Sequence, residues 1–214
     1  PEDEISGRIG HKTSGRLGAQ ASVRISKKDQ GRSILRTRRG VSLAPDSRQR
    51  AIVKLHYHAH SGDGGGKLLA HGRYLERDGA GQGGEAGRFY DRETDADDAP
   101  SRLSGWEKAD RRHIRIILAP ESGARFSDLK DLTRAVMARV ERDLGVPLEW
   151  VAVDHHNTDN PHSHIILRGR RSDGPDLIIP RDYAISGLRY TAQEVATEIL
   201  GERGREAFAL RPFR

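Results

Sequence analysis

The residues best suited to chemistry in this sequence are histidines, and they gather in one short segment. Four of the ten histidines fall within His155-His156-Asn157-Thr158-Asp159-Asn160-Pro161-His162-Ser163-His164. One residue separates His162 from His164, so in a strand their side chains point to the same face. This spacing predicts a two-imidazole platform for a metal ion, whereas the alternative is a surface turn that happens to be rich in histidine.

A third ligand has to come from the residues just before the turn. Both His155 and His156 leave the preceding apolar segment. The strand register decides which of them returns beside the pair, and we favour His155. Three neutral imidazoles with open coordination positions are typical of a catalytic site in which a divalent ion polarises a phosphoryl oxygen. Asp159 is a candidate for orienting a ligand imidazole, and a simple turn-forming role explains it equally well.

A second group of histidines lies in His56-Tyr57-His58-Ala59-His60. On a strand, the three histidines would share one face and could bind a metal of their own. The alternative, which we favour, is an exposed edge strand whose imidazoles are solvated or contact DNA phosphates.

Apolar segments that read as strands surround both groups. A β-branched run at 51–55 opens the strand that carries the second group, and the turn-rich residues 61–66 follow it. Residues 113–118 alternate as a strand that Pro120 closes. Residues 150–153 and 165–167 flank the histidine cluster as a hairpin, and residues 176–179 can add a short strand.

Helices are expected in three places. Residues 127–144 place apolar side chains on one stripe, with Gly145 just beyond the end. Residues 67–75 can form a short helix, and Thr191-x-x-Glu194 resembles a capping box that opens a helix through about residue 200. Residues 78–101 offer few apolar side chains and are expected to form a surface excursion. The predicted fold class is α+β, an antiparallel sheet flanked by helices.

Composition divides the chain into two parts. Residues 1–50 hold 12 Lys and Arg against 5 Asp and Glu, a local charge of +7. Because the net charge of the whole chain is +6, the remaining residues carry about −1. We therefore expect a basic flexible arm at 1–49, in which Arg36, Arg38 and Arg39 could track DNA, and a folded domain at 50–214.

Because the chain lacks cysteine, any metal must be held by histidines and carboxylates. No run approaches the roughly 18 apolar residues of a membrane span. A chain that begins at Pro1 is expected to be a fragment or a processed product.

These motifs resemble those of the HUH endonucleases, and among them the conjugative relaxases of the VirD-type and mobilisation-protein branch. The His-x-His pair of the family matches His162-Ser163-His164 with Pro161 before it, and the upstream family histidine matches His155. Tyr74-Leu75 ahead of Gly79 is similar to the nucleophile motif, and His113 opens a strand as a histidine often does there. The chain departs from the pattern at Asn157 and Asn160, where an acidic residue and a histidine are common.

The resemblance implies an HUH-like sandwich fold and a metal-dependent enzyme that nicks one DNA strand. It assigns the metal, Mg²⁺ or Mn²⁺, to His155, His162 and His164, and the nucleophile to Tyr74. Apart from the resemblance, Tyr57 within the second histidine group is the rival nucleophile, and a packing role is the alternative for Tyr74. The tyrosine would form a 5′-phosphotyrosyl link and leave a free 3′-hydroxyl. Three arginines after the histidine strand are candidate phosphate contacts, with a solvated strand end as the alternative: Arg168, Arg170 and Arg171.

The implied partners are single-stranded DNA at a transfer origin, accessory relaxosome proteins and a type IV secretion coupling protein. The implied location is the bacterial cytoplasm, with export alongside DNA to a recipient cell and no membrane insertion. Two other functions fit part of the pattern. A rolling-circle replication initiator uses the same chemistry, but it often carries paired tyrosines on one helix, and no second tyrosine follows Tyr74 at helical spacing. A non-enzymatic basic DNA-binding module would use the histidine cluster structurally.

Overall fold

The structure, a computed structural model, describes residues 47–60, 66–77, 81–95 and 98–204. The chain divides into two units, Pro1–Val41 and Ser42–Arg214, and all described residues belong to the second. The arm expected at 1–49, with Arg36, Arg38 and Arg39, therefore lies outside the described residues apart from its last three positions. Within the described ranges, no helix combines the length and the apolar character needed to cross a bilayer.

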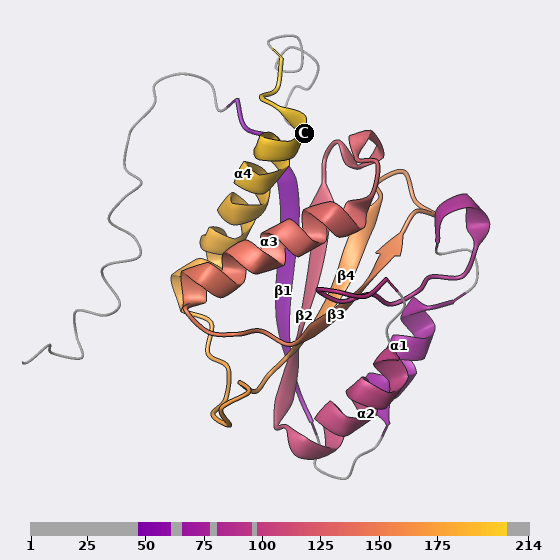
Figure 1. The fold of residues 1–214 in the computed structure, drawn as a ribbon, viewed down its shortest axis with the longest axis vertical. Helices are drawn as coiled ribbons and strands as arrows, with labels where there is room; N and C mark the ends of the chain where they lie inside the picture. The colour runs from indigo at the N-terminus through magenta and orange to yellow at the C-terminus, as the bar shows by residue number, and fades with distance from the viewer. Residues whose placement is uncertain (1–46, 61–65, 78–80, 96–97, 205–214) are drawn as a thin grey trace, which may run out of the picture. The chain divides into compact units, whose positions relative to one another are not determined.

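A four-stranded antiparallel sheet forms the centre of the domain (Figure 1). Its strands are β1 (Ala51–Ala59), β2 (Arg112–Pro120), β3 (Trp150–His155) and β4 (His162–Arg168), in the spatial order β1-β2-β4-β3. The strands expected near 51–55, 113–118, 150–153 and 165–167 are confirmed, and so is the hairpin between the last two. The strand expected at 176–179 is wrong, because this segment makes only an isolated bridge between Asp176 and Arg170.

Helices α3 (Leu129–Leu144) and α4 (Leu188–Leu200) cover one face of the sheet. Helix α3 follows the predicted stripe, and Gly145 ends it in the left-handed conformation with φ 68°. The predicted capping box of α4 is wrong. A π-helical turn at Tyr183–Gly187 leads directly into the helix, so Thr191 lies inside it and its hydroxyl donates to Asp143.

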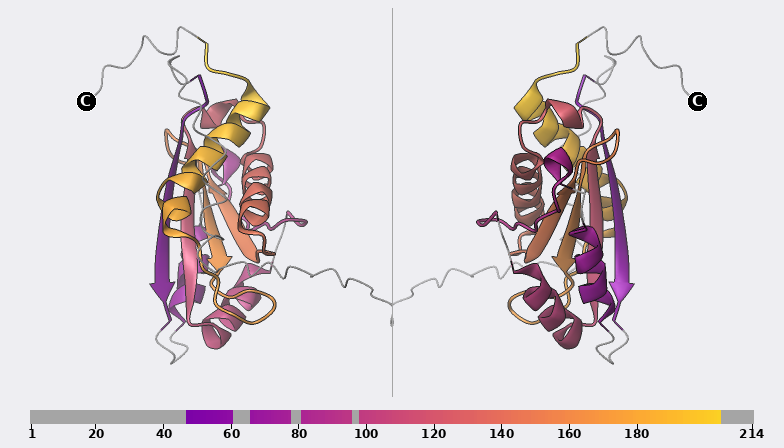
Figure 2. Two further views of the ribbon diagram at one scale, coloured as in Figure 1. Left: turned by 90° about the vertical axis from the view of Figure 1, so that its left-hand side faces the viewer. Right: turned by 90° about the vertical axis from the view of Figure 1, so that its right-hand side faces the viewer.

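The opposite face is covered by α1 (Lys67–Leu75) and α2 (Ala99–Ala109), which lie across the sheet from α3 (Figure 2). The bounds of α1 are those predicted. The expectation of a surface excursion at 78–101 is wrong in part, because Phe89 and Tyr90 are fully buried and Tyr90 forms a bridge with Ala152 of β3. Helix α2 was not predicted at all. Two 3₁₀ turns complete the secondary structure, at Gln82–Gly84 and Gly123–Arg125.

The close approach of α1 to α2 is set by Gly72. A Cβ atom at this position would lie 2.5 Å from Leu103 Cδ1, whose side chain is fully buried. Two turns of α1 are therefore held by α2, and Leu75, at the end of α1, packs with Val153 and Ile166 of the sheet. This packing fixes the C-terminal end of α1 over the end of the sheet where β3 and β4 meet.

Candidate metal centre

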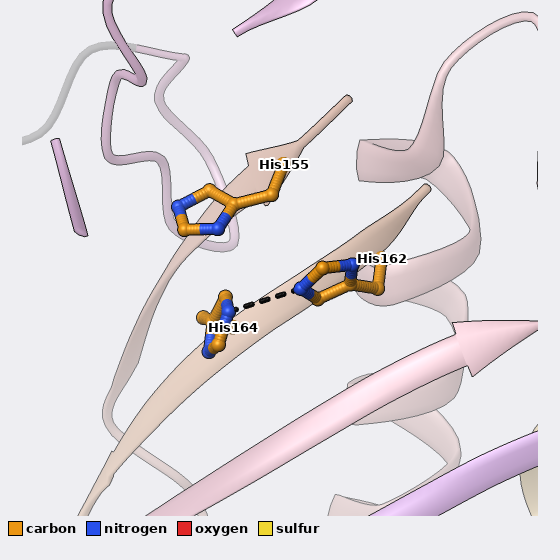
Figure 3. Close-up of side chains that lie close together, drawn as sticks. All are labelled: His155, His162 and His164. Carbon is orange, nitrogen blue, oxygen red and sulfur yellow. Dashed lines mark hydrogen bonds between the residues drawn. The ribbon is translucent and has the colours of Figure 1, made fainter. Parts of the chain in front are cut away.

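The two histidines of β4 and one from β3 meet at the turn end of the hairpin (Figure 3). The register pairs His155 with His162, and His164 follows on the same face. Each of the three offers a ring nitrogen within 4.8 Å of the others. The structure thus selects His155 over His156 as the third histidine, and we call His155, His162 and His164 the triad.

Backbone carbonyls hold two of the imidazoles in defined orientations. His155 Nε2 lies 2.9 Å from the carbonyl oxygen of Leu75, and His162 Nδ1 lies 3.0 Å from that of Asn160. A carbonyl oxygen can only accept, so each of these nitrogens carries the proton and the other ring nitrogen keeps its lone pair. This is how metal-binding histidines are commonly held. Asp159, expected in this role, is exposed, and the Asn160 carbonyl takes it instead.

The spacing of His162 and His164 fits a single ion. His162 Nε2 and His164 Nε2 lie 3.1 Å apart. Two nitrogens that bind one ion at about 2.1 Å would be separated by about 3.0 Å at a right angle and about 3.4 Å at the tetrahedral angle. The observed separation lies between these values. Because His162 is protonated on Nδ1, His164 Nε2 donates to His162 Nε2 in this contact, and both nitrogens would bind one ion once the His164 proton moves to its Nδ1.

The electrostatics of the triad favour neutral imidazoles. Burial lowers the pKa of His164 to about 3, with the neighbouring His155 and His162 contributing. Burial also lowers the pKa of His155, and the charge of Arg77 lowers it further. An imidazole must be neutral to bind a metal, so these two side chains are ready to act as ligands at neutral pH.

A buried polar network supports the hairpin from the other face of the sheet. The Tyr90 hydroxyl donates to Asp154 Oδ1 at 2.7 Å, and the Thr133 hydroxyl donates to Ser163 Oγ at 2.8 Å. Asp154 and Ser163 are cross-strand partners next to the triad, and burial raises the pKa of Asp154. These bonds anchor both strands of the hairpin to the α3 side of the sheet, next to the triad. The sequence gives little sign of this network, since Tyr90 and Thr133 lie far from the cluster along the chain.

The metal site considered for His56, His58 and His60 does not form among the described residues, and His60, just beyond β1, instead joins a hydrogen-bond chain with His113 and Arg115 of β2. Arg115 Nε donates to His113 Nε2 at 2.9 Å, and His113 Nδ1 lies 2.8 Å from His60 Nε2. His60 Nδ1 in turn lies 2.7 Å from the carbonyl oxygen of Asp110. These contacts are satisfied together when both imidazoles are neutral and donate through Nδ1. In the described part of the chain, the triad is the one group of three or more ligating side chains compact enough for a metal ion.

Tyr74 lies at the end of α1, beside the triad. Its neighbour Leu75 supplies the carbonyl that holds His155, and its own side chain is 61% exposed. The guanidinium of Arg77 lies 4.6 Å from the centre of the Tyr74 ring. The charge of Arg77 also lowers the pKa values of His155 and His164, which places Arg77 close to the triad as well. The accessible phenol of Tyr74 therefore belongs to the same end of α1 as the carbonyl that orients His155.

Tyr57, the rival nucleophile, lies on the other face of the sheet. It pairs with Ile114 of β2, which belongs to the core beneath α3 and α4, whereas His164 pairs with Ile117 on the α1 face. The guanidinium of Arg112 lies 5.7 Å from the Tyr57 ring centre. The register thus separates Tyr57 from the triad by the thickness of the sheet.

The three arginines expected to hold phosphates near the metal are bound elsewhere. Arg168 forms ion pairs with Asp110 and Glu149, and it lies four residues, about 13 Å along the strand, from His164. Internal partners also engage the other two arginines: Arg170 Nε donates to the carbonyl of Gly174, and Arg171 pairs with Asp173. Their positions give no support to a phosphate contact beside the triad.

Besides Arg77, Arg115 is a basic residue near the triad, and the sequence alone did not single it out. It alternates with His113 and Ile117 along β2, on the face that α1 covers. A cation in a mostly apolar central strand is the signal that could have pointed to it.

No protein-family model matches the chain, and no curated protein matches it.

Proposed function

We propose that the domain is a relaxase, a metal-dependent endonuclease and strand transferase that nicks one DNA strand at a transfer origin through Tyr74. One observation supports this above all: the carbonyl of Leu75, next to Tyr74, orients the triad imidazole of His155 at 2.9 Å. Because α1 carries Tyr74 and the carbonyl that holds a triad imidazole of β3, this contact ties the nucleophile to the metal centre, and phosphoryl transfer requires such positioning.

The reaction is a transesterification. The deprotonated phenol of Tyr74 attacks phosphorus, the bond from phosphorus to the 3′ oxygen breaks, and that oxygen leaves as a hydroxyl after taking up a proton. A divalent ion on the triad would withdraw charge from the non-bridging oxygens of the phosphate. The 5′-phosphotyrosyl link keeps the bond energy, so the 3′-hydroxyl can later attack it and reseal the strand.

The three imidazole ligands of the triad indicate which metal ion the site would prefer. Of the two ions expected, Mn²⁺ fits better, because three imidazoles without a carboxylate suit a transition metal more than Mg²⁺. Within the same series, Co²⁺, Ni²⁺ and Zn²⁺ are expected to bind the triad more tightly than Mn²⁺.

Nicking of single-stranded DNA tests the proposal. The protein is incubated with a set of end-labelled oligonucleotides that tile the transfer regions of mobile elements, with Mn²⁺ or with EDTA. We expect a discrete nick that EDTA and His164→Ala each abolish. His156→Ala, which changes a histidine next to the triad, serves as the matched control and should nick normally.

Two results would contradict the proposal. Nicking that persists with His164→Ala would remove the triad from the reaction. Tight oligonucleotide binding that is indifferent to EDTA, without a nick in any sequence of the set, would favour the non-enzymatic DNA-binding module.

A further inference from the structure

A cavity of about 230 Å³ opens on the α1 face of the sheet, directly beside the triad. His164 lines it at one side, and the remaining polar lining comes from β1, α1 and β2: His56, His58, His71 and Arg115. The rest of the lining is aliphatic, and it includes no carboxylate. The cavity therefore presents one permanent cation and several imidazoles to whatever enters it.

Arg115 has no acidic partner among the described residues. Its one hydrogen bond to them is from Nε to His113 Nε2, which leaves the two terminal nitrogens for another acceptor. Its cross-strand neighbours are His56 and Ile166. Burial lowers its pKa with no carboxylate to oppose the effect, whereas the Asp110 carboxylate raises the pKa of Arg168. A half-buried cation without an anion is costly, and an anionic ligand would offset that cost.

The guanidinium is also held in place before any ligand arrives. The chain of hydrogen bonds from the Asp110 carbonyl through His60 and His113 leaves His113 Nε2 as an acceptor for Arg115. One edge of the guanidinium is thereby fixed against the sheet. A planar fork with its remaining donors free matches the geometry of a phosphate.

The distance to the triad suits a second phosphate of the same strand. Arg115 pairs with Ile166, and His164 lies two residues before Ile166 on the same face. The side chains of such diagonal cross-strand neighbours leave the backbone about 7–8 Å apart. A nucleic-acid strand, whose phosphates are regularly spaced, can place one phosphate at the triad and a neighbouring one at Arg115.

We propose that Arg115, with His58 and His71 beside it, forms a subsite for a backbone phosphate of single-stranded DNA, adjacent to the triad and independent of the metal. This inference rests on the proposed function for the identity of its ligand. It replaces the phosphate contacts that the sequence suggested for Arg168, Arg170 and Arg171.

The test measures binding without metal and without chemistry. Fluorescence anisotropy of a labelled oligothymidylate is recorded in EDTA over a series of salt concentrations. Arg115→Gln should weaken binding by about 10-fold or more, as for the loss of a charge-assisted hydrogen bond. The slope of log affinity against log salt should fall by about 0.7, the value for one phosphate contact to a single strand. Arg115→Lys should keep the slope and lose part of the affinity.

Arg139→Gln is the matched control. Arg139 lies on α3, on the sheet face opposite the cavity, and forms an ion pair with Glu198 of α4. This substitution should change neither affinity nor slope. Mn²⁺ affinity of Arg115→Gln should equal that of the wild type and its unfolding temperature should be no lower, which separates a lost subsite from a lost fold. An unchanged salt slope in Arg115→Gln would overturn the proposal. The proposal would also be overturned if Arg115→Gln changed how well inorganic phosphate competes with the oligonucleotide but left the affinity for the oligonucleotide itself unchanged. Absence of nicking in the metal-dependent assay would contradict the relaxase proposal and leave this binding result in place.

Discussion

At the scale of single residues, the triad depends on which histidine completes it. His155 and His156 are adjacent, and only the hairpin register distinguishes them. His155→Ala is expected to lower the affinity for Mn²⁺ at least 100-fold, since even outer contacts of metal ligands contribute 10- to 100-fold. His156→Ala should leave the affinity within a factor of about two. Isothermal titration calorimetry on both variants checks this, and equal losses in the two would contradict the triad.

The sequence predicted the residues of the site unevenly, for a physical reason. The alternation His162-x-His164 is local, so strand geometry alone places both imidazoles on one face. The orienting groups, by contrast, are the carbonyls of Leu75 and Asn160, which have no sequence signature because every residue has a carbonyl. Arg115 becomes visible only when β2 is placed between β1 and β4.

At the scale of elements, the placement of α1 against α2 is decisive, because α1 carries both Tyr74 and the carbonyl that orients His155. Gly72→Ala would bring a methyl group to 2.5 Å from Leu103 Cδ1. Overpacking of this kind costs about 1–3 kcal/mol, and the better helix propensity of alanine recovers up to about 1 kcal/mol. We expect a net loss of about 1 kcal/mol in the free energy of unfolding, measured with urea.

Gly105→Ala is the matched control in α2, because a Cβ there meets nothing within 4 Å. This substitution should stabilise the protein by up to about 1 kcal/mol. If both variants were equally stable, the tight contact at Gly72 would have no role in positioning α1.

The elements differ in how well the sequence predicted them. Helix α3 has a strong apolar stripe and a glycine stop, and its bounds follow from these local signals. Helix α2 has Pro100 at its start, Gly105 in its middle and only Leu103 and Trp106 as large buried apolar side chains, so its pattern is weak. It forms because the sheet offers an apolar face to cover. Tertiary contacts of that kind cannot be read from a local period.

At the scale of the whole molecule, the α1 face should make the fold sensitive to acid. Burial lowers the pKa of His71 to about 4 and that of His113 to about 3, below the ordinary value of 6.5. The unfolded chain therefore binds more protons than the folded one below pH 6.5, and stability falls as the pH falls through this range. Glu76 and Asp154, whose pKa values burial raises, oppose this in part at lower pH.

We expect the free energy of unfolding to decrease from pH 6.5 to pH 5 in urea titrations of the metal-free protein. His113→Gln should reduce the slope by up to one proton, or about 1.4 kcal/mol per pH unit. A stability that is flat over this range in the wild type would show that these imidazoles titrate normally in the folded state.

The covalent intermediate tests the central claim most directly. It joins Tyr74 to the DNA strand, and its formation would require the metal that the triad binds. A nicking reaction with Mn²⁺ is stopped, digested with trypsin and nuclease, and analysed by mass spectrometry. Cleavage after Arg73 and Arg77 would release Tyr74-Leu75-Glu76-Arg77, and the account predicts a nucleotide on this peptide, joined through its 5′ phosphate to the tyrosine. A nucleotide on the peptide that contains Tyr57, or a nicked strand that bears a free 5′ phosphate and no peptide, would contradict it.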